Sequence, residues 1–319
     1  MLQVVKEKNC EYDLFIKEIT EKVKEKMGEG YSTRIYKITK NNSLELDSLV
    51  MLKEGKNFAP NIYLLPYYEA YVQGTDMNEL TDRLCCVYRD CNVPMVDEKF
   101  SYSFEDMKTK IIYRLVSYDR NEKLLEQVPH IRYLDLAITF HCLVRDDENG
   151  IGTIRITSEH MKQWKASLQE LRTCAIKNTK RMFPYSIKSM EEVIKNMLAE
   201  EMGDREDDLP EELLYNIRHE NSATQKHRMY ILTNLKGING ATCLLYENVL
   251  QEFADQIDSD IFILPSSIHE VILVPYDKSI TREALAEMVK DINHTQVAHD
   301  EVLSDKVYLY SRNTKSLSV

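Results

Sequence analysis

The sequence contains few of the local patterns that mark common active sites. Only 9 of the 319 residues are glycine, and neither G-x-G-x-x-G nor G-x-x-x-x-G-K-[ST] occurs, so no glycine loop that cradles nucleotide phosphates is predicted. The G-x-S-x-G and H-E-x-x-H patterns are missing as well. These absences remove the usual signatures of nucleotide-binding enzymes, serine hydrolases and zinc proteases, and we expect no cofactor.

Cysteine occurs seven times, an odd number, and never as C-x-x-C. Scattered cysteines of this kind are typical of free thiols in a reducing cytoplasm rather than of a disulfide framework. The densest group, CCVYRDC, places Cys85 and Cys86 side by side with Cys91 five residues later. Adjacent cysteines without a nearby histidine are awkward zinc ligands, so we predict cysteines on a helix and no metal site.

Long apolar runs and excess positive charge are also missing. No window approaches 18 consecutive apolar residues, and the first residues, MLQVVKEKNCEYDLF, lack the apolar core of a secretory signal. The net charge is −11, and an acidic chain repels the phosphate backbone of nucleic acids. We therefore expect a cytoplasmic protein that binds neither a membrane nor nucleic acid.

The patterns that are present predict an α+β protein made of two units of antiparallel sheet with packed helices. Apolar residues at helical spacing predict a helix over residues 12–27, and short strands follow up to residue 52. The best strand is LDLAITFHCLV, which a turn joins to IGTIRIT in a hairpin. The segments RMYILTN, GATCLLY, IFIL and HEVILV are also predicted to be strands. We place an N-terminal unit at residues 1–128 and a C-terminal unit at 129–319, with an exposed acidic insertion around 200–226.

Several helix starts are predicted from capping residues. Ser167 and Ser189 are each followed three residues later by glutamate, which is the capping-box pattern, and Asp76 with Glu79 resembles it. Thr281 is the expected first cap of the last helix.

The segment ILPSSIHEVILVP raises the question of a nucleophile beside its base. Ser267, His269 and Glu270 are the residue types that such chemistry needs, but neighbours on an extended segment point to opposite faces. A turn between two buried strands explains more of the residues, and we expect the imidazole of His269 to bond to the backbone of that turn. A binding role for His269 or Glu270 remains the alternative.

Two further groups are candidate binding residues. His141 shares a strand face with Asp135 and Thr139, and together with Arg132 these side chains are candidates to hold an anion, although a solvent-facing strand surface is the favoured interpretation. Tyr67 and Tyr71 are four residues apart, hence on one face of a helix, where tyrosines suit a protein interface or the packing of that helix on its sheet.

Three segments resemble a family of uncharacterised bacterial proteins common in anaerobic Gram-positive bacteria, and more distantly the YtpQ-like family. They are NIYLLPYYEAYVQGTDMNEL, SEHMKQWKASLQELRTCAIKNTKRMFP and NGATCLLYENVLQEFADQIDSDIFILPSSIHEVILVP. The resemblance spans most of the chain outside the acidic insertion. It implies a bacterial cytoplasmic protein and assigns no reaction.

We therefore expect a non-enzymatic binding or adaptor protein whose partner is another protein. The alternative is an unclassified hydrolase with its site near the turn of His269 and Glu270.

Overall fold

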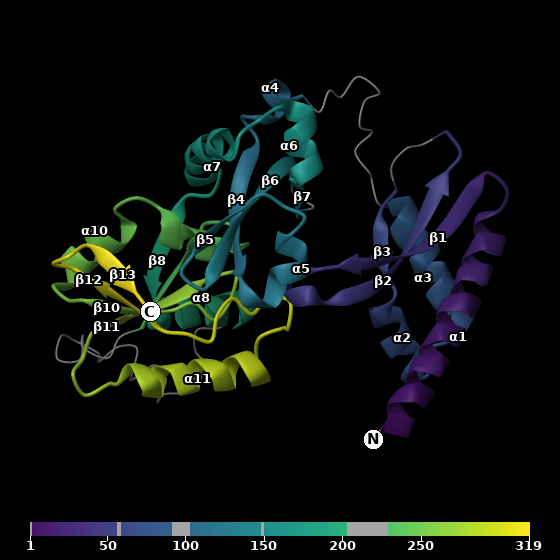
Figure 1. The fold of residues 1–319 in the computed structure, drawn as a ribbon. Helices are drawn as coiled ribbons and strands as arrows, with labels where there is room; N and C mark the ends of the chain where they lie inside the picture. Colours follow the sequence, from purple (N-terminus) through teal and green to yellow (C-terminus); the bar gives the residue numbers. More distant parts are fainter. Residues whose placement is uncertain (1, 56–58, 91–102, 148–149, 203–228) are drawn as a thin grey trace. The chain divides into compact units, whose positions relative to one another are not determined.

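The computed structural model describes residues 2–55, 59–90, 103–147, 150–202 and 229–319. These residues form an α+β fold in which each of the three sheets is antiparallel, as the sequence predicts (Figure 1). The chain divides into two compact units: unit 1 comprises residues 1–40 and 44–101, and unit 2 comprises residues 41–43 and 102–319. The predicted acidic insertion lies largely at residues 203–228, outside the described residues.

Unit 1 is a three-stranded sheet covered by helices. Its strands follow the order β1-β2-β3, with Ile35 of β1 opposite Leu49 of β2. The long helix presents Phe15, Ile19 and Val23, spaced by four residues, to the core. Gly74 adopts a positive φ between the second and third helices, and the Asp76 carboxylate then caps the third. The elements are α1 (Leu2–Met27), β1 (Tyr31–Thr39), β2 (Glu45–Lys53), β3 (Asn61–Tyr63), α2 (Leu65–Val72) and α3 (Met77–Asp90).

The first half of unit 2 is a sheet built around one long central strand. This strand, β6, pairs with β4 along one edge and with β5 and then β7 along the other. Because both edges are paired and both faces are covered, Leu136, Thr139 and Phe140 are all buried. The elements are η1 (Asn41–Ser43), α4 (Phe104–Met107), β4 (Ile111–Ser117), η2 (Asp119–Asn121), α5 (Glu122–Leu125), β5 (His130–Tyr133), β6 (Leu136–Asp147) and β7 (Gly150–Arg155).

The second half of unit 2 is a six-stranded sheet of order β13-β12-β10-β11-β9-β8. The predicted capping box at Ser167 opens α7, and Thr281 caps α11, whose Leu285 and Val289 pack on the sheet (Figure 1). The elements are α6 (Ser158–Trp164), α7 (Leu168–Met182), β8 (Tyr185–Ser189), α8 (Met190–Met202), β9 (Tyr230–Asn234), η5 (Gly240–Leu245), α10 (Val249–Ile257), β10 (Ile261–Leu264), β11 (Val271–Pro275), α11 (Arg282–Thr295), β12 (Tyr308–Ser311) and β13 (Ser316–Ser318).

Two features differ from the sequence prediction. The segment GATCLLY, predicted as a strand, is the short 3-10 helix η5. The backbone turns at Asn239, which has a φ of 52°, and Gly240 then lies so close to Thr233 and to the carbonyl of His269 that a Cβ atom there would overlap both. The predicted unit boundary at residue 128 also differs from the division at 101–102, because β4 pairs with β6.

Candidate functional site

The segment from Ile263 to Pro275 is a strand, a connection and a second strand. β10 and β11 pair antiparallel, with Leu264 opposite Ile272. In the connection, the buried hydroxyl of Ser267 accepts a hydrogen bond of 3.0 Å from the backbone N–H of His269. The hydroxyl therefore organises the connection, as expected for a serine in a turn.

The imidazole of His269 contacts two groups outside this connection. Its Nδ1 accepts a hydrogen bond of 3.4 Å from the backbone N–H of Asn239, and its Nε2 lies 3.4 Å from the carboxylate of Glu301. The ring thus bonds to backbone, although to that of the segment before η5 and not to its own turn. Burial raises the pKa of the neighbouring Glu270 carboxyl.

His141 lies inside the sheet of β4 to β7, so the expectation that it faces solvent is wrong. Its side chain is 5% exposed, and its Nε2 lies 3.1 Å from the hydroxyl of Thr139. Burial, together with the charges of Arg114 and Arg155, holds the pKa of the imidazole well below its usual range. His141 is therefore a neutral, buried side chain at neutral pH.

Asp135 does not lie with Thr139 and His141, the residues with which it is grouped by its position in the sequence. It lies between β5 and β6, and its carboxylate accepts hydrogen bonds of 2.6 Å each from the hydroxyls of Ser304 and Tyr308. This carboxylate connects the two sheets of unit 2.

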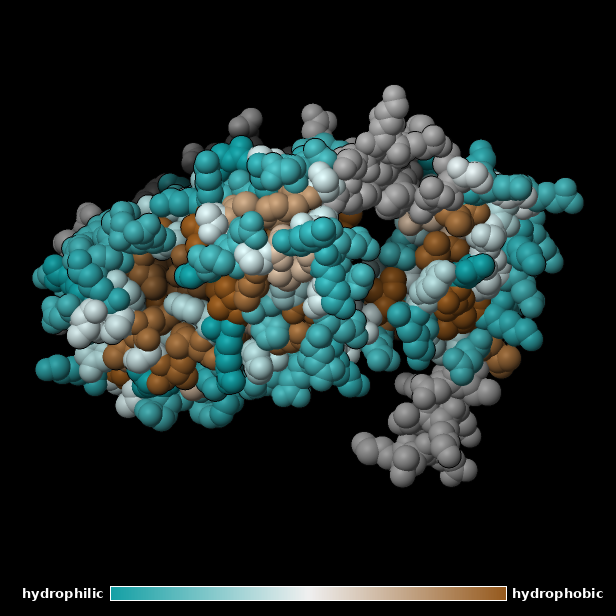
Figure 2. Space-filling model, turned by 45° about the horizontal axis from the view of Figure 1, so that its top comes forward, coloured by the Kyte–Doolittle hydropathy of each residue, from teal (hydrophilic) through white to brown (hydrophobic). Residues whose placement is uncertain are grey.

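The two tyrosines of α2 are placed differently from each other. Tyr67 is half-buried and packs against the core of unit 1. The ring of Tyr71 contacts that of Phe15 at a centroid distance of 5.3 Å, yet the residue is 42% exposed. Other apolar residues of α1 and α2 are exposed as well, and Figure 2 shows brown, apolar side chains at the surface of the molecule. We call this set the tyrosine surface; it consists of Leu14, Leu65, Tyr71 and Val72.

Unit 2 also contains a concave site that no local pattern predicts. We call it the polar cleft; its volume is about 390 Å³. The residues that line it come from η2, from α11 and from the segment between α11 and β12. They are Arg120, Lys290, Asn293, His294, Val297, His299, Val302 and Asp305.

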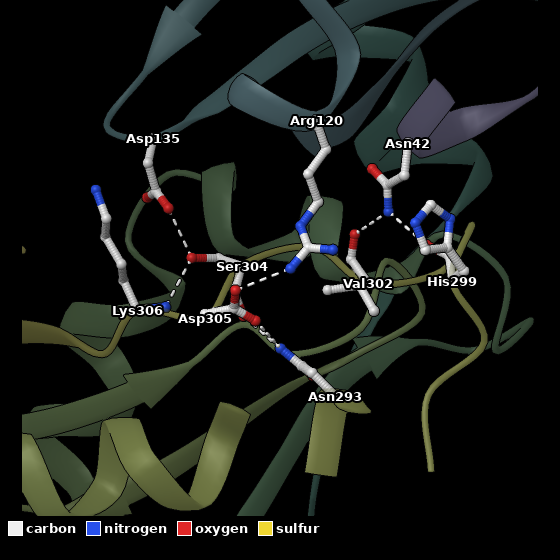
Figure 3. Close-up of polar contacts among 9 residues, drawn as sticks. All are labelled: Asn42, Arg120, Asp135, Asn293, His299, Val302, Ser304, Asp305 and Lys306. Atoms are coloured by element: carbon white, nitrogen blue, oxygen red, sulfur yellow. Dashed lines mark hydrogen bonds and ion pairs between the residues drawn. The ribbon is translucent and has the colours of Figure 1, made fainter. Parts of the chain in front are cut away.

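A network of hydrogen bonds fixes one wall of the polar cleft (Figure 3). The guanidinium of Arg120 lies 2.8 Å from the carboxylate of Asp305. The buried Asn293 amide donates to the same carboxylate at 2.8 Å and to the carbonyl of Ser304 at 2.9 Å. The polar groups of this wall are therefore held in position before any ligand arrives.

A second group of contacts holds the rim. The side-chain amide of Asn42 donates to the carbonyls of His299 and Val302 at 2.7 and 2.6 Å (Figure 3). Asn121 in turn accepts a hydrogen bond of 2.8 Å from the backbone N–H of Asn42. These bonds explain why Asn42, at a φ of 56°, is buried in unit 2.

The charges around the cleft are partly balanced. Asp305 pairs with Arg120, and Glu287 lies 2.7 Å from Lys290, whose pKa it raises. The cleft can therefore offer guanidinium and ammonium donors to a ligand, beside the imidazoles of His294 and His299. Within the described ranges, no group of three histidine, cysteine or acidic side chains is placed to hold a metal ion.

The cleft cannot be predicted from local patterns because its residues are far apart in the chain. Arg120 and Asp305 are separated by 185 residues. His294 lies in the last turn of α11 and His299 follows that helix, and the two form no ligand spacing that would mark a site.

Comparison with known proteins gives one match, to a family model. Residues 12–312 match the model of a family of unknown function, DUF5688. No curated protein and no solved structure matches the chain. None of the helices in the described residues is long and apolar enough to cross a membrane. Since the family model spans most of the sequence, the chain belongs to the DUF5688 family of unknown function.

Proposed function

We propose that this protein is a non-enzymatic, cytoplasmic binding protein that holds a small polar molecule in the polar cleft. The observation that carries the proposal is the cleft itself, at about 390 Å³ with converging polar side chains. Small-molecule sites typically have volumes of about 300–1,000 Å³ and a few placed polar groups.

The chemistry of the lining indicates the class of ligand. Arg120 and Lys290 suit an acidic group, because both donate charge-assisted hydrogen bonds. Val297 and Val302 offer apolar contact beside them. Since Asp305 and Glu287 already balance part of the positive charge, we expect a ligand with one acidic group on a small carbon skeleton.

The state of Lys290 argues against its use as a nucleophile. A lysine that attacks a substrate needs a lowered pKa, so that the neutral amine is present. Glu287 raises the pKa of Lys290 instead, so its ammonium group serves as a donor.

The test is native mass spectrometry after incubation with a pooled extract of small polar metabolites. We expect the wild type to retain a bound species, and Val297→Trp to lose it because the indole fills the cleft. The matched control is Val87→Trp, on an exposed position of α3, which should bind like the wild type. Equal binding by Val297→Trp, or no bound species on the wild type, would refute the proposal.

A hydrolase site at His269 and Glu270 is the second candidate. It is favoured by the raised pKa of Glu270 and by the closeness of the His269 ring to Glu301. Chromogenic esters and phosphate esters test it: turnover that Glu270→Gln reduces more than 100-fold would establish it. Equal rates for the two proteins would remove it.

A protein partner at the tyrosine surface is a third candidate, favoured by the exposure of Tyr71 and Val72. Pull-downs would compare the wild type with the double variant Tyr67→Ala, Tyr71→Ala. Tyr36→Ala, at another exposed tyrosine of unit 1, is the control. A partner lost only from the double variant supports this surface, and identical partner sets count against it.

A further inference from the structure

The wall of the polar cleft holds a positive and a negative group side by side. The guanidinium of Arg120 and the carboxylate of Asp305 are 2.8 Å apart, and both residues line the cleft. Their side chains are 35% and 38% exposed, so each keeps open surface beside the partner that it already has. A ligand can therefore contact both groups without breaking their ion pair.

The guanidinium of Arg120 has hydrogen-bond donors to spare. A guanidinium carries several N–H donors, and among the described residues this one makes a single hydrogen bond, from Nη2 to the carboxylate of Asp305. The backbone carbonyl of Arg120, and not its guanidinium, accepts the hydrogen bond from the hydroxyl of Ser43. The remaining N–H groups are available to a carboxylate, the group that arginine binds best together with phosphate.

The carboxylate of Asp305 has acceptor capacity to spare. A carboxylate offers about four lone-pair sites on its two oxygens. In Asp305 one oxygen accepts from Arg120 and the other from the amide of Asn293, and Figure 3 shows the two side chains reaching this carboxylate. Each oxygen therefore keeps a lone pair that a ligand donor can use.

Asn293 adds a further acceptor to the same wall. Its Nδ2 must point to the carbonyl of Ser304 and to Asp305, because exchanging nitrogen and oxygen would set an oxygen against two acceptors. This orientation also fixes Oδ1, which is buried and has no donor among the described residues. The residue is 8% exposed and lines the cleft. Because buried acceptors in proteins are nearly always paired, this oxygen favours a ligand that brings a donor.

The end of α11 favours the same kind of group. Lys290, Asn293, His294 and Val297 all line the cleft, and α11 ends at Thr295, so the last turn of the helix borders the cleft. The C-terminal end of a helix carries a partial negative charge that stabilises a cation nearby. This charge adds to that of Asp305 and favours a positively charged donor such as an ammonium group.

We propose that the ligand of the polar cleft is a free α-amino acid, with its carboxylate on Arg120 and its ammonium group on Asp305. This inference rests on the proposed function and names the ligand class. In an α-amino acid both charged groups are attached to one carbon atom, which matches a guanidinium and a carboxylate held 2.8 Å apart. An apolar side chain of the ligand would lie against Val297 and Val302.

Molecules with only one of the two charged groups fit the wall less well. A simple carboxylic acid would bring its negative charge next to Asp305 and leave the open acceptors of Asp305 and Asn293 unused. A simple amine would bring its positive charge next to Arg120. Like charges placed side by side oppose binding, so both molecules should bind more weakly than the amino acid.

Isothermal titration calorimetry of the full chain tests the ligand class, with the common L-α-amino acids as probes. The tightest binder is then compared with its deaminated acid, with its decarboxylated amine and with an isomer that carries the amino group at the far end. For L-leucine these are 4-methylpentanoate, 3-methylbutylamine and 6-aminohexanoate. We expect saturable binding of an amino acid by the wild type, and at least tenfold weaker binding of each analogue.

Asp305→Asn preserves the shape of the side chain and removes its charge. We expect this variant to bind the amino acid at least tenfold more weakly than the wild type, and the deaminated acid no more weakly. Asp146→Asn is the matched control, because Asp146 pairs with Lys236, is 39% exposed and lies outside the lining of the cleft. It should stay within twofold of the wild type for both ligands. The analogue series on the wild type decides the question even if Asp305→Asn fails to fold.

The outcomes separate this inference from the proposed function. The inference is overturned, and the proposed function stands, if the wild type binds the deaminated acid as tightly as the amino acid, or a component of the polar extract but no amino acid, and Val297→Trp loses that binding. Binding of neither the extract nor any amino acid refutes both. Equal binding of the amino acid by Val297→Trp and the wild type also refutes both, because the amino acid would then bind outside the cleft.

Discussion

The guanidinium of Arg120 lies 2.8 Å from the carboxylate of Asp305, which joins the segment after β4 to the segment before β12. Both side chains are more than one-third exposed, at 35% and 38%. Solvent therefore screens the pair, and we expect Arg120→Ala to lower the free energy of unfolding by less than about 1 kcal/mol. Urea denaturation measures this, and a loss of several kcal/mol would show that Arg120 is structural rather than available to a ligand.

Asn293 has a larger structural role in the same wall. Its buried amide donates to the carbonyl of Ser304 and to Asp305, so Asn293→Ala leaves a buried acceptor without a donor. We expect a loss of about 1–3 kcal/mol of unfolding free energy. Asn78→Ala, at an exposed asparagine whose side chain accepts a hydrogen bond from Lys22, is the control and should change stability by less than about 0.5 kcal/mol. Similar losses from the two variants would contradict this account.

Asp135 and Tyr308 form a coupled pair between the two sheets of unit 2. The Tyr308 hydroxyl donates to the Asp135 carboxylate at 2.6 Å from a side chain that is fully buried. Asp135→Ala leaves that hydroxyl without its acceptor, at a cost of about 1–3 kcal/mol. In a protein that already carries Tyr308→Phe, the same change leaves no unpaired hydroxyl at position 308 and therefore costs less. A double-mutant cycle should therefore give a coupling energy of at least about 0.5 kcal/mol. Strictly additive losses would show that the bond contributes nothing.

The buried, neutral His141 makes stability depend on pH. Its pKa is lowered in the folded protein, so below about pH 6.5 the unfolded chain takes up a proton that the folded protein does not. Stability from this group is present above that pH and is lost as the pH falls. Between pH 7.5 and 5.5 the wild type should lose about 1 kcal/mol more unfolding free energy than His141→Gln. Parallel pH profiles for the two proteins would contradict the burial of a neutral imidazole.

The titration of Glu270 changes the stability in the opposite direction with pH. Burial raises its pKa in the folded protein, so the folded state retains a proton that the unfolded chain has already released. The contribution to stability is present at low pH and is lost as the pH rises through the folded pKa. We therefore expect the melting temperature of Glu270→Gln to exceed that of the wild type at pH 7.5, and the difference to shrink towards pH 4. A difference that is constant with pH would exclude titration of Glu270 as its cause.

Local sequence patterns predict much of the fold because they act within a few residues. The helical spacing of Phe15, Ile19 and Val23 and the capping residues Ser167 and Thr281 each produced the predicted helix. The prediction of a strand at GATCLLY is wrong because a short buried apolar run is compatible both with a strand and with a buried helical turn. The close approach of Gly240 to β9 decides between the two structures.

The candidate sites were harder to predict because they depend on pairing and on long-range contacts. Alternation along β6 identified the face that carries His141, but whether that face is buried depends on the rest of the fold. The sequence suggests an anion near Arg132 and His141, whereas Arg114 and Arg155 join that sheet face only through strand register. The polar cleft depends on contacts across more than 100 residues and has no counterpart in any local pattern.

Proton NMR of the histidine rings tests most directly whether the polar cleft binds a ligand. The Cε1–H resonances of His294 and His299, assigned with His294→Gln and His299→Gln, are followed during titration with the pooled polar extract. We predict that these two resonances shift while that of His160, whose ring bonds to Thr157 at the start of α6, stays in place. Unchanged His294 and His299 resonances in a protein that binds a ligand from the extract would contradict the account.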